Sequence, residues 1–160
     1  MTALSIVYAA LFYTATAVLV VGVALKIRSY AGTPAPLKIP TTPAPVTTTG
    51  VALRLTREVL FFESLFKGSK WTWLFGWMFH AALALVLLRH MRYFQQPVWD
   101  VIAFIQPFGT YAGFAMVAGL AGLWARRFLV DRVRYISTPS DHLNLALLLA
   151  IGVSGLGMRF

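Results

Sequence analysis

Apolar residues run along the chain in four long blocks, separated by polar and basic segments. Residues 4–25 contain no charged side chain, and residues 71–90 carry His80 as the single ionisable group among their first eighteen positions. Two further blocks cover residues 101–125 and 142–158. Because about 20 apolar residues are enough to cross the hydrocarbon core of a bilayer, the pattern predicts four transmembrane helices.

The segment between the first two spans has a different composition. Residues 29–50 hold five prolines and six threonines, and repeated X-Pro steps favour an extended, solvated strap over a helix. Residues 51–66 alternate basic and apolar side chains, which is typical of an amphipathic helix lying along the membrane surface. We therefore expect an all-α integral membrane helical bundle, a single domain over residues 1–160, with one interfacial helix beside its four spans.

The third span is rich in small residues, which let neighbouring helices or a planar cofactor come close. These residues are Gly109, Gly113, Ala115, Ala118, Gly119 and Gly122. Pro107 lies near the start of the span and is expected to kink or shorten it. Arg126 and Arg127 end the span, a basic loop follows, and residues 137–141 predict the turn and N-cap that open the fourth span.

Composition agrees with a membrane protein. The chain is 59% hydrophobic and 12% charged, with a mean hydropathy of +0.73, whereas soluble domains carry about 25% charged residues. It has no cysteine, which excludes disulfides, iron–sulfur clusters and thiolate metal sites in this chain. The net charge of +9 does not indicate nucleic-acid binding, because the basic residues cluster between the apolar spans.

The basic residues also predict an orientation. Eleven of the fourteen lie between spans one and two or between spans three and four, and three lie at the opposite ends of the spans. By the positive-inside rule the long basic segments, including residues 29–70, are cytoplasmic and the N-terminus is outside. The expected location is the cytoplasmic membrane of a bacterium or an archaeon, with the first span retained because no basic residue precedes it.

Two histidines on the second predicted span are the main candidates for chemistry. His80 and His90 are ten residues apart, which is ~15 Å of helix rise and ~80° around the axis, so both can face one bundle interior at different depths. Such imidazoles would give one axial ligand each to two stacked haems, and Gly76 would let a flat macrocycle approach the backbone. In the alternative, His80 is a satisfied polar residue between helices and His90 an interfacial one.

The third histidine does not complete this set. His142 opens the fourth span beside Asp141, and we expect it to be a helix-start residue paired with a carboxylate or the backbone. Two haems with two histidines each need four imidazoles, and the chain has three. Some ligands would then come from another subunit, or one haem binds, or the sequence ends before helices that belong to it.

The sequence resembles the nitrate reductase gamma subunit family of b-type dihaem cytochromes. The resemblance rests on His80–x9–His90 and on the basic segment 126–141, RRFLVDRVRYISTPSD. Residues 38–45, 61–80, 87–94 and 125–142 are similar to the gamma-like cytochrome b subunit of complexes associated with dissimilatory sulfite reductase, in sulfur metabolism.

This resemblance implies that haem b exchanges electrons between a membrane (mena)quinone and a cytoplasmic iron–sulfur subunit of the heterodisulfide reductase type, within a larger complex. It also implies that His80 and His90 are axial ligands to an inner and an outer haem. Family members continue into a further helix that carries the partner histidines, so we expect the chain to be incomplete at its C-terminus. The family's quinol-site lysine has no counterpart in the third span.

The remaining polar residues near the outer ends of the spans are candidates for quinone binding, although each is more readily an interfacial residue. They are Arg89, Arg92, Gln106 and Tyr111. A haem-free membrane anchor that docks a soluble redox subunit is the competing function. A transporter or channel subunit is disfavoured, since the spans carry His80 as their one buried ionisable group and show no inverted repeat. We expect an electron-transfer subunit that is not catalytic by itself.

Overall fold

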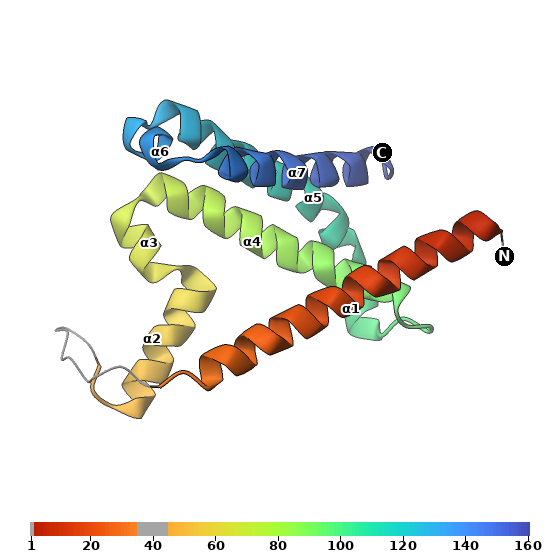
Figure 1. The fold of residues 1–160 in the computed structure, drawn as a ribbon, viewed down its shortest axis with the longest axis horizontal. Coiled ribbons are helices and arrows are strands. Elements are labelled where there is room, and N and C mark those ends of the chain that lie inside the picture. The colour runs from red at the N-terminus through yellow and green to blue at the C-terminus, as the bar shows by residue number, and fades with distance from the viewer. Residues whose placement is uncertain (1, 35–44) are drawn as a thin grey trace. The chain divides into compact units, whose positions relative to one another are not determined.

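The computed structural model describes residues 2–34 and 45–160, and the chain divides into two units, Met1–Ala44 and Pro45–Phe160 (Figure 1). The first unit contains helix α1, Ala3–Ala31, which Thr2 caps by accepting a hydrogen bond from the Ser5 backbone N–H. No residue of α1 is buried. An apolar helix with this exposure is typical of a membrane span surrounded by lipid or by helices of other chains.

The second unit is helical throughout its regular structure. Its elements are α2 (Thr48–Phe61), α3 (Glu63–Gly68), α4 (Lys70–His90), the 3₁₀ turn η1 (Met91–Tyr93), α5 (Asp100–Leu129), α6 (Asp131–Ile136) and α7 (Pro139–Gly157). Within the described residues, four helices are long and apolar enough to cross a membrane: α1, α4 with η1, α5 and α7. The prediction of an all-α chain with four spans is confirmed.

The strap and the amphipathic helix differ from the prediction at their ends. Helix α1 continues through Tyr30 to Ala31, and α2 begins at Thr48, so part of 29–50 is helical. Threonines without prolines do not prevent a helix, and Thr47 supplies the N-cap by accepting from the Gly50 N–H at 3.1 Å. Residues 35–44, where most of the predicted strap falls, lie outside the described residues.

The predicted interfacial helix is broken in two. Phe62 separates α2 from α3 with a φ of 51°, the left-handed region that a bulky residue rarely adopts. The Ser64 backbone N–H donates to the Glu58 carboxylate at 3.0 Å, and the Ser64 hydroxyl donates to the same carboxylate. These bonds span the break and hold α3 at an angle to α2, which the alternation of basic and apolar residues did not indicate.

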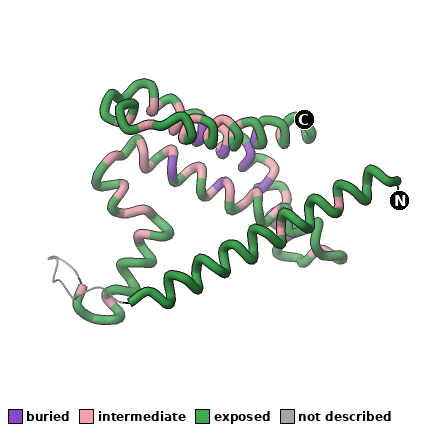
Figure 2. Tube along the Cα trace, in the orientation of Figure 1, coloured by how far each residue is buried: buried purple, intermediate pink, exposed green. Residues whose placement is uncertain are grey.

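Helix α5 lies between α4 and α7 and supplies most of the core. The buried cluster consists of Ala82, Ala112, Met116 and Leu120, with Phe79 packed against it, and Figure 2 shows buried positions along α4, α5 and α7. The helix runs uninterrupted through Pro107, so Pro107 does not shorten the span, and the alternative, a kink, stays a prediction. Proline removes one i→i−4 hydrogen bond, and membrane helices tolerate this loss where neighbouring groups compensate.

The small residues of α5 allow the close approach of α4. A Cβ added to Gly119 would lie 3.0 Å from the Phe75 carbonyl oxygen and 3.0 Å from the Phe79 backbone nitrogen. A Cβ on Gly122 would overlap the Phe75 ring. On the opposite side, a Cβ on Gly113 would lie 2.8 Å from a methyl group of Leu156 in α7. The prediction that these glycines admit neighbouring helices is confirmed.

The start of α7 also agrees with the sequence. Thr138 and Asp141 form a capping box, and Pro139 occupies the first turn. Arg127, in the last turn of α5, donates to the Ser137 hydroxyl at 2.9 Å and lies 3.5 Å from the Asp141 carboxylate. The segment predicted as a basic loop contains the short helix α6, and its contacts tie the end of α5 to the start of α7.

Candidate functional site

His80 and His90 have the same local geometry on α4. The Nδ1 atom of His80 lies 2.7 Å from the Gly76 carbonyl oxygen, and the Nδ1 atom of His90 lies 2.7 Å from the Val86 carbonyl oxygen. A carbonyl oxygen accepts, so each Nδ1 is the protonated nitrogen and each Nε2 carries the lone pair. Among the described residues, none makes a hydrogen bond to either Nε2, and both side chains are exposed. This arrangement presents two imidazoles ready to ligate a metal through Nε2.

The surroundings of His80 are aromatic. The Phe62 ring meets the imidazole edge-on with centroids 5.1 Å apart, and the Phe79 ring does so at 4.8 Å. Phe62 reaches this position because of the left-handed break between α2 and α3. The indole N–H of Trp73 donates to the Phe61 carbonyl at 2.6 Å, and that of Trp77 donates to the end of α2 at 2.9 Å. These two hydrogen bonds hold the α2–α3 junction next to His80.

Gly76 is buried and faces α3. A Cβ on Gly76 would meet a Leu65 methyl group at 3.8 Å, an ordinary van der Waals distance. Its carbonyl oxygen is the acceptor for His80 Nδ1. In the described residues, Gly76 thus orients the imidazole through its backbone, and Leu65 lies in contact distance of the space over its Cα.

His90 lies at the last residue of α4. The Tyr93 ring is tilted against it with centroids 5.7 Å apart, and Tyr93 in turn accepts a hydrogen bond from Arg92 at 2.7 Å. The two candidate ligands are therefore at the middle and at the end of one span, ~15 Å apart by helix rise.

His142 is engaged differently from the prediction. The Trp124 indole N–H donates to His142 Nδ1 at 3.0 Å, and the Phe128 ring lies 5.0 Å from the imidazole. The partner is an indole on α5, neither a carboxylate nor the backbone, because the start of α7 packs beside the last turns of α5. Nδ1 is the acceptor in this pair, so the proton is on Nε2 and the ring is not poised to ligate a metal.

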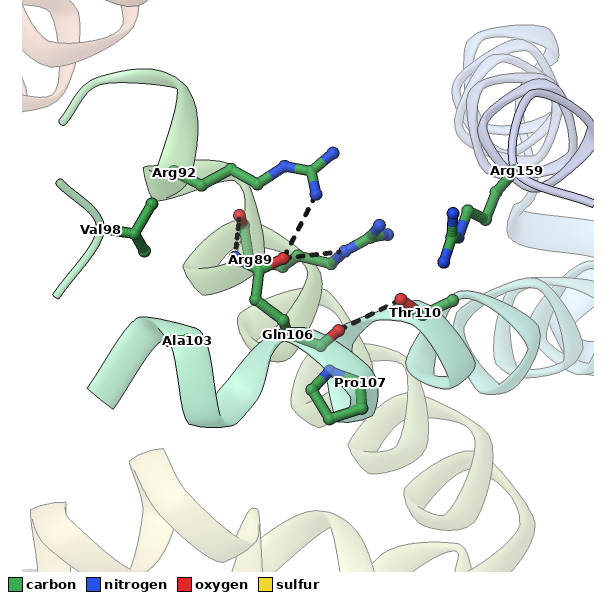
Figure 3. Close-up of a pocket in the computed structure, with 8 residues that line it drawn as sticks. All are labelled: Arg89, Arg92, Val98, Ala103, Gln106, Pro107, Thr110 and Arg159. Atoms are coloured by element: carbon green, nitrogen blue, oxygen red, sulfur yellow. Dashed lines mark hydrogen bonds between the residues drawn. The ribbon is translucent and has the colours of Figure 1, made fainter. Parts of the chain in front are cut away.

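Three arginines converge at the end of the bundle where α4 ends and α5 begins (Figure 3). They line a pocket of about 530 Å³ together with Gln106. The residues around it are Arg89, Arg92, Val98, Ala103, Gln106, Pro107, Thr110 and Arg159. The Gln106 side-chain oxygen accepts from Arg89 at 3.4 Å and from Arg92 at 3.4 Å.

The pocket collects three of the four residues that we considered for quinone binding, Arg89, Arg92 and Gln106. Tyr111 is not among the lining residues; it is exposed, and its ring lies 6.5 Å from Phe160. Arg159 was missed, although it is the third basic residue on this side of the predicted topology. Phe62, Trp73 and Trp124 were also missed, since their roles depend on contacts between helices.

Two carboxylates outside the spans are stabilised in their charged form. The Ser64 hydroxyl and backbone N–H hold the pKa of Glu58 below its usual value of 4.5, and the Lys67 ammonium, 2.6 Å from Glu63, lowers the pKa of Glu63. Both groups lie at the α2–α3 junction. In the described part of the chain, no three His, Cys, Asp or Glu side chains gather to hold a metal ion, so each histidine on α4 stands as a single potential ligand.

Comparison with known proteins identifies the family. Residues 63–160 match the family described as the nitrate reductase gamma subunit. A relative from Archaeoglobus fulgidus, named Hdr-like menaquinol oxidoreductase cytochrome b-like subunit, is 38% identical over 92% of this chain and 57% of its own length. A relative of the same name from Archaeoglobus profundus is 31% identical over 96% of this chain and 58% of its own length.

The chain thus spans less than three fifths of the length of these relatives. No solved structure matches. The family match covers α3 to α7, and with them His80, His90 and the arginine pocket. With four helices suited to cross a membrane, this multi-pass chain belongs to the nitrate reductase gamma subunit family.

Proposed function

We propose that this chain is the membrane-embedded cytochrome b subunit of a complex that exchanges electrons between menaquinone and a cytoplasmic iron–sulfur subunit. The names of the relatives support a link to menaquinol and to a complex of the Hdr-like type. The observation that carries the proposal is the paired geometry of His80 and His90, each with its Nδ1 proton held by a backbone carbonyl and its Nε2 outward.

The two histidines fit haem as single axial ligands. The Gly76 and Val86 carbonyls fix the tautomer and orientation of each ring, which raises the basicity of Nε2. When bound, haem iron supplies one-electron transfer. His80 would hold it near the middle of the span and His90 near one boundary, which makes a path across the membrane. Each histidine would supply one ligand, and further ligands would come from another subunit or from helices that this sequence does not include.

The orientation and the docking side follow from charge. The positive-inside rule places α2, α3 and α6 on the cytoplasmic side and His90 near the outer face. Helix α6 and its flanks expose Leu129 to 81% and Tyr135 to 92% beside Arg132. An exposed aromatic and aliphatic surface with basic residues is suited to bind an acidic protein partner. We propose that the iron–sulfur subunit docks there, nearest the His80 level.

A reduced-minus-oxidised visible spectrum of the purified protein tests this function. The wild type is expected to show a b-type signal, which His80→Ala and His90→Ala should each diminish. His142→Ala is the matched control and should leave the spectrum unchanged, because that imidazole accepts from Trp124. A menaquinol analogue should reduce the haem in membranes.

The alternative is a haem-free membrane anchor that docks a soluble redox subunit through the exposed surface at α6. A wild-type protein that is colourless, well folded and bound to its partners would establish the anchor and contradict the cytochrome. Equal loss of signal in all three histidine variants would contradict the assignment of His80 and His90 as the ligands. Haem that responds to dithionite but not to a quinol would contradict the quinone link.

A further inference from the structure

The arginine pocket has a charge imbalance that the electron-transfer role does not explain. Arg89 comes from α4, Arg92 from η1 and Arg159 from the residues after α7, and their guanidinium groups point into the same space (Figure 3). No carboxylate is among the lining residues. Among the described residues, none of the three arginines forms an ion pair, since the ion pairs found there involve Lys67, Arg127 and Arg134.

The hydrogen bonds within the pocket leave most of its donors unused. A guanidinium group has five N–H donors. Arg89 and Arg92 share one neutral oxygen of Gln106 at 3.4 Å each, and Arg92 also donates to Tyr93 at 2.7 Å. In the described chain, the Arg159 guanidinium makes no side-chain hydrogen bond. Like charges gathered without a counterion repel, so the arrangement calls for an anion with several acceptor oxygens.

The positions of these arginines are not those that membrane topology requires. Eleven of the fourteen basic residues lie on the side predicted to be cytoplasmic. The remaining three are Arg89, Arg92 and Arg159, and all three line this one pocket. Basic residues that act through the positive-inside rule need no common target, whereas these three, separated by up to seventy positions in sequence, meet in space.

The pocket and the candidate haem ligands lie on different faces of α4. Arg89 faces α5, where a Cβ on Gly109 would lie 2.7 Å from the Arg89 Cβ. His80 faces α3, with Phe62 at 5.1 Å, and His90 is 100° around the helix from Arg89. A quinone has neutral carbonyl oxygens and does not balance three cations.

The wall of the pocket favours an amphiphile over a small ion. Ala103 and Pro107 form one side of it. Beside them, Phe104, Phe108 and Tyr111 follow at i, i+4 and i+7 along α5 and are exposed to 71%, 54% and 67%. The basic pocket therefore continues into an apolar stripe, at the end of the spans where headgroups lie. We propose that Arg89, Arg92 and Arg159 bind the phosphate of an anionic membrane lipid, whose acyl chains lie along this stripe.

Lipid binding to the full chain in detergent micelles, measured by native mass spectrometry, tests the proposal. The probes are phosphatidylglycerol, zwitterionic phosphatidylcholine and inorganic phosphate. One phosphatidylglycerol is expected to stay bound per chain, more tightly at low ionic strength. A basic residue near anionic lipid is worth ~1 kcal/mol, so Arg159→Gln should weaken binding about five-fold and Arg92→Gln with Arg159→Gln about thirty-fold.

Arg159 lies beyond the end of α7 and is exposed, so its replacement is expected to leave the helices intact, which circular dichroism and thermal unfolding verify. Arg159→Lys should retain most of the binding. The matched control is Arg132→Gln on α6, an exposed arginine at the other end of the bundle, which should bind lipid as the wild type does.

Three results would overturn the proposal. If phosphatidylcholine binds as tightly as phosphatidylglycerol, the pocket does not recognise net negative charge. If inorganic phosphate displaces the lipid at equal concentration, the site holds free phosphate and the apolar stripe has no part in it. If Arg132→Gln weakens binding as much as Arg159→Gln, the lipid is held by general surface charge.

Discussion

Gly119 offers a quantitative test of how closely α4 and α5 pack. In Gly119→Ala the new Cβ would lie 3.0 Å from two backbone atoms of α4, the Phe75 oxygen and the Phe79 nitrogen, and 3.1 Å from the Phe79 Cβ. Backbone atoms cannot rotate away, so α4 must move by a few tenths of an ångström. Overpacking costs about 1–3 kcal/mol, and the helix propensity of alanine over glycine returns up to about 1 kcal/mol.

We therefore expect Gly119→Ala to lower the free energy of unfolding by about 1–2 kcal/mol. Alanine at two other glycines should have smaller effects, which gives a graded series. At Gly113 the added Cβ would meet the end of the Leu156 side chain at 2.8 Å, which can rotate, so the cost is smaller. At Gly155 nothing lies within 4 Å, so Gly155→Ala should equal or exceed the wild type in stability.

Thermal unfolding in detergent, followed by circular dichroism, measures this series. For a chain of this size each kcal/mol corresponds to about 2–4 °C in Tm. The expected order of melting temperatures is Gly155→Ala highest, then Gly113→Ala, then Gly119→Ala. If Gly119→Ala and Gly155→Ala melt together, the helices do not approach as closely as the structure indicates, and the role assigned to the small residues of α5 is refuted.

The remaining predictions concern the contacts around the two ends of the bundle. Trp77→Phe removes a hydrogen bond to an α2 carbonyl and should speed amide hydrogen exchange in α2, whereas unchanged exchange would show that the indole does not hold the junction. Hydrogen bonds from Ser64 lower the pKa of Glu58, so the contribution of the charged Glu58 carboxylate to folding stability is present above pH 4.5 and is lost as the pH falls through the lowered pKa. The difference in Tm between wild type and Ser64→Ala should therefore shrink in acid. A difference that stays constant with pH would contradict this. Trp124→Phe removes the donor to His142 Nδ1 and should change the ¹⁵N chemical shift of that nitrogen, while an identical chemical shift would exclude the hydrogen bond.

Hydrophobic pattern alone placed the spans, because a membrane requires long apolar helices and tolerates few alternatives. The second span was predicted over residues 71–90 and is Lys70–His90. The effect of Pro107 was predicted only as a choice between a kink and a shortened span, and the span is not shortened, since the loss of one hydrogen bond is small against a continuous lipid-buried helix. The capping residues at Thr138 and Asp141 were recognised because capping is local.

For the candidate site, too, some features could be predicted from the sequence and others depended on the tertiary structure. The sequence determined that His80 and His90 lie in the middle and at the end of one helix, since both facts follow from spacing along one chain segment. Only the tertiary structure decided that Phe62 reaches His80 through a left-handed break, that Trp124 engages His142, and that Arg159 joins Arg89 and Arg92 in one pocket. These contacts join residues on different helices, and their geometry depends on how glycines let the helices approach, which no local pattern specifies.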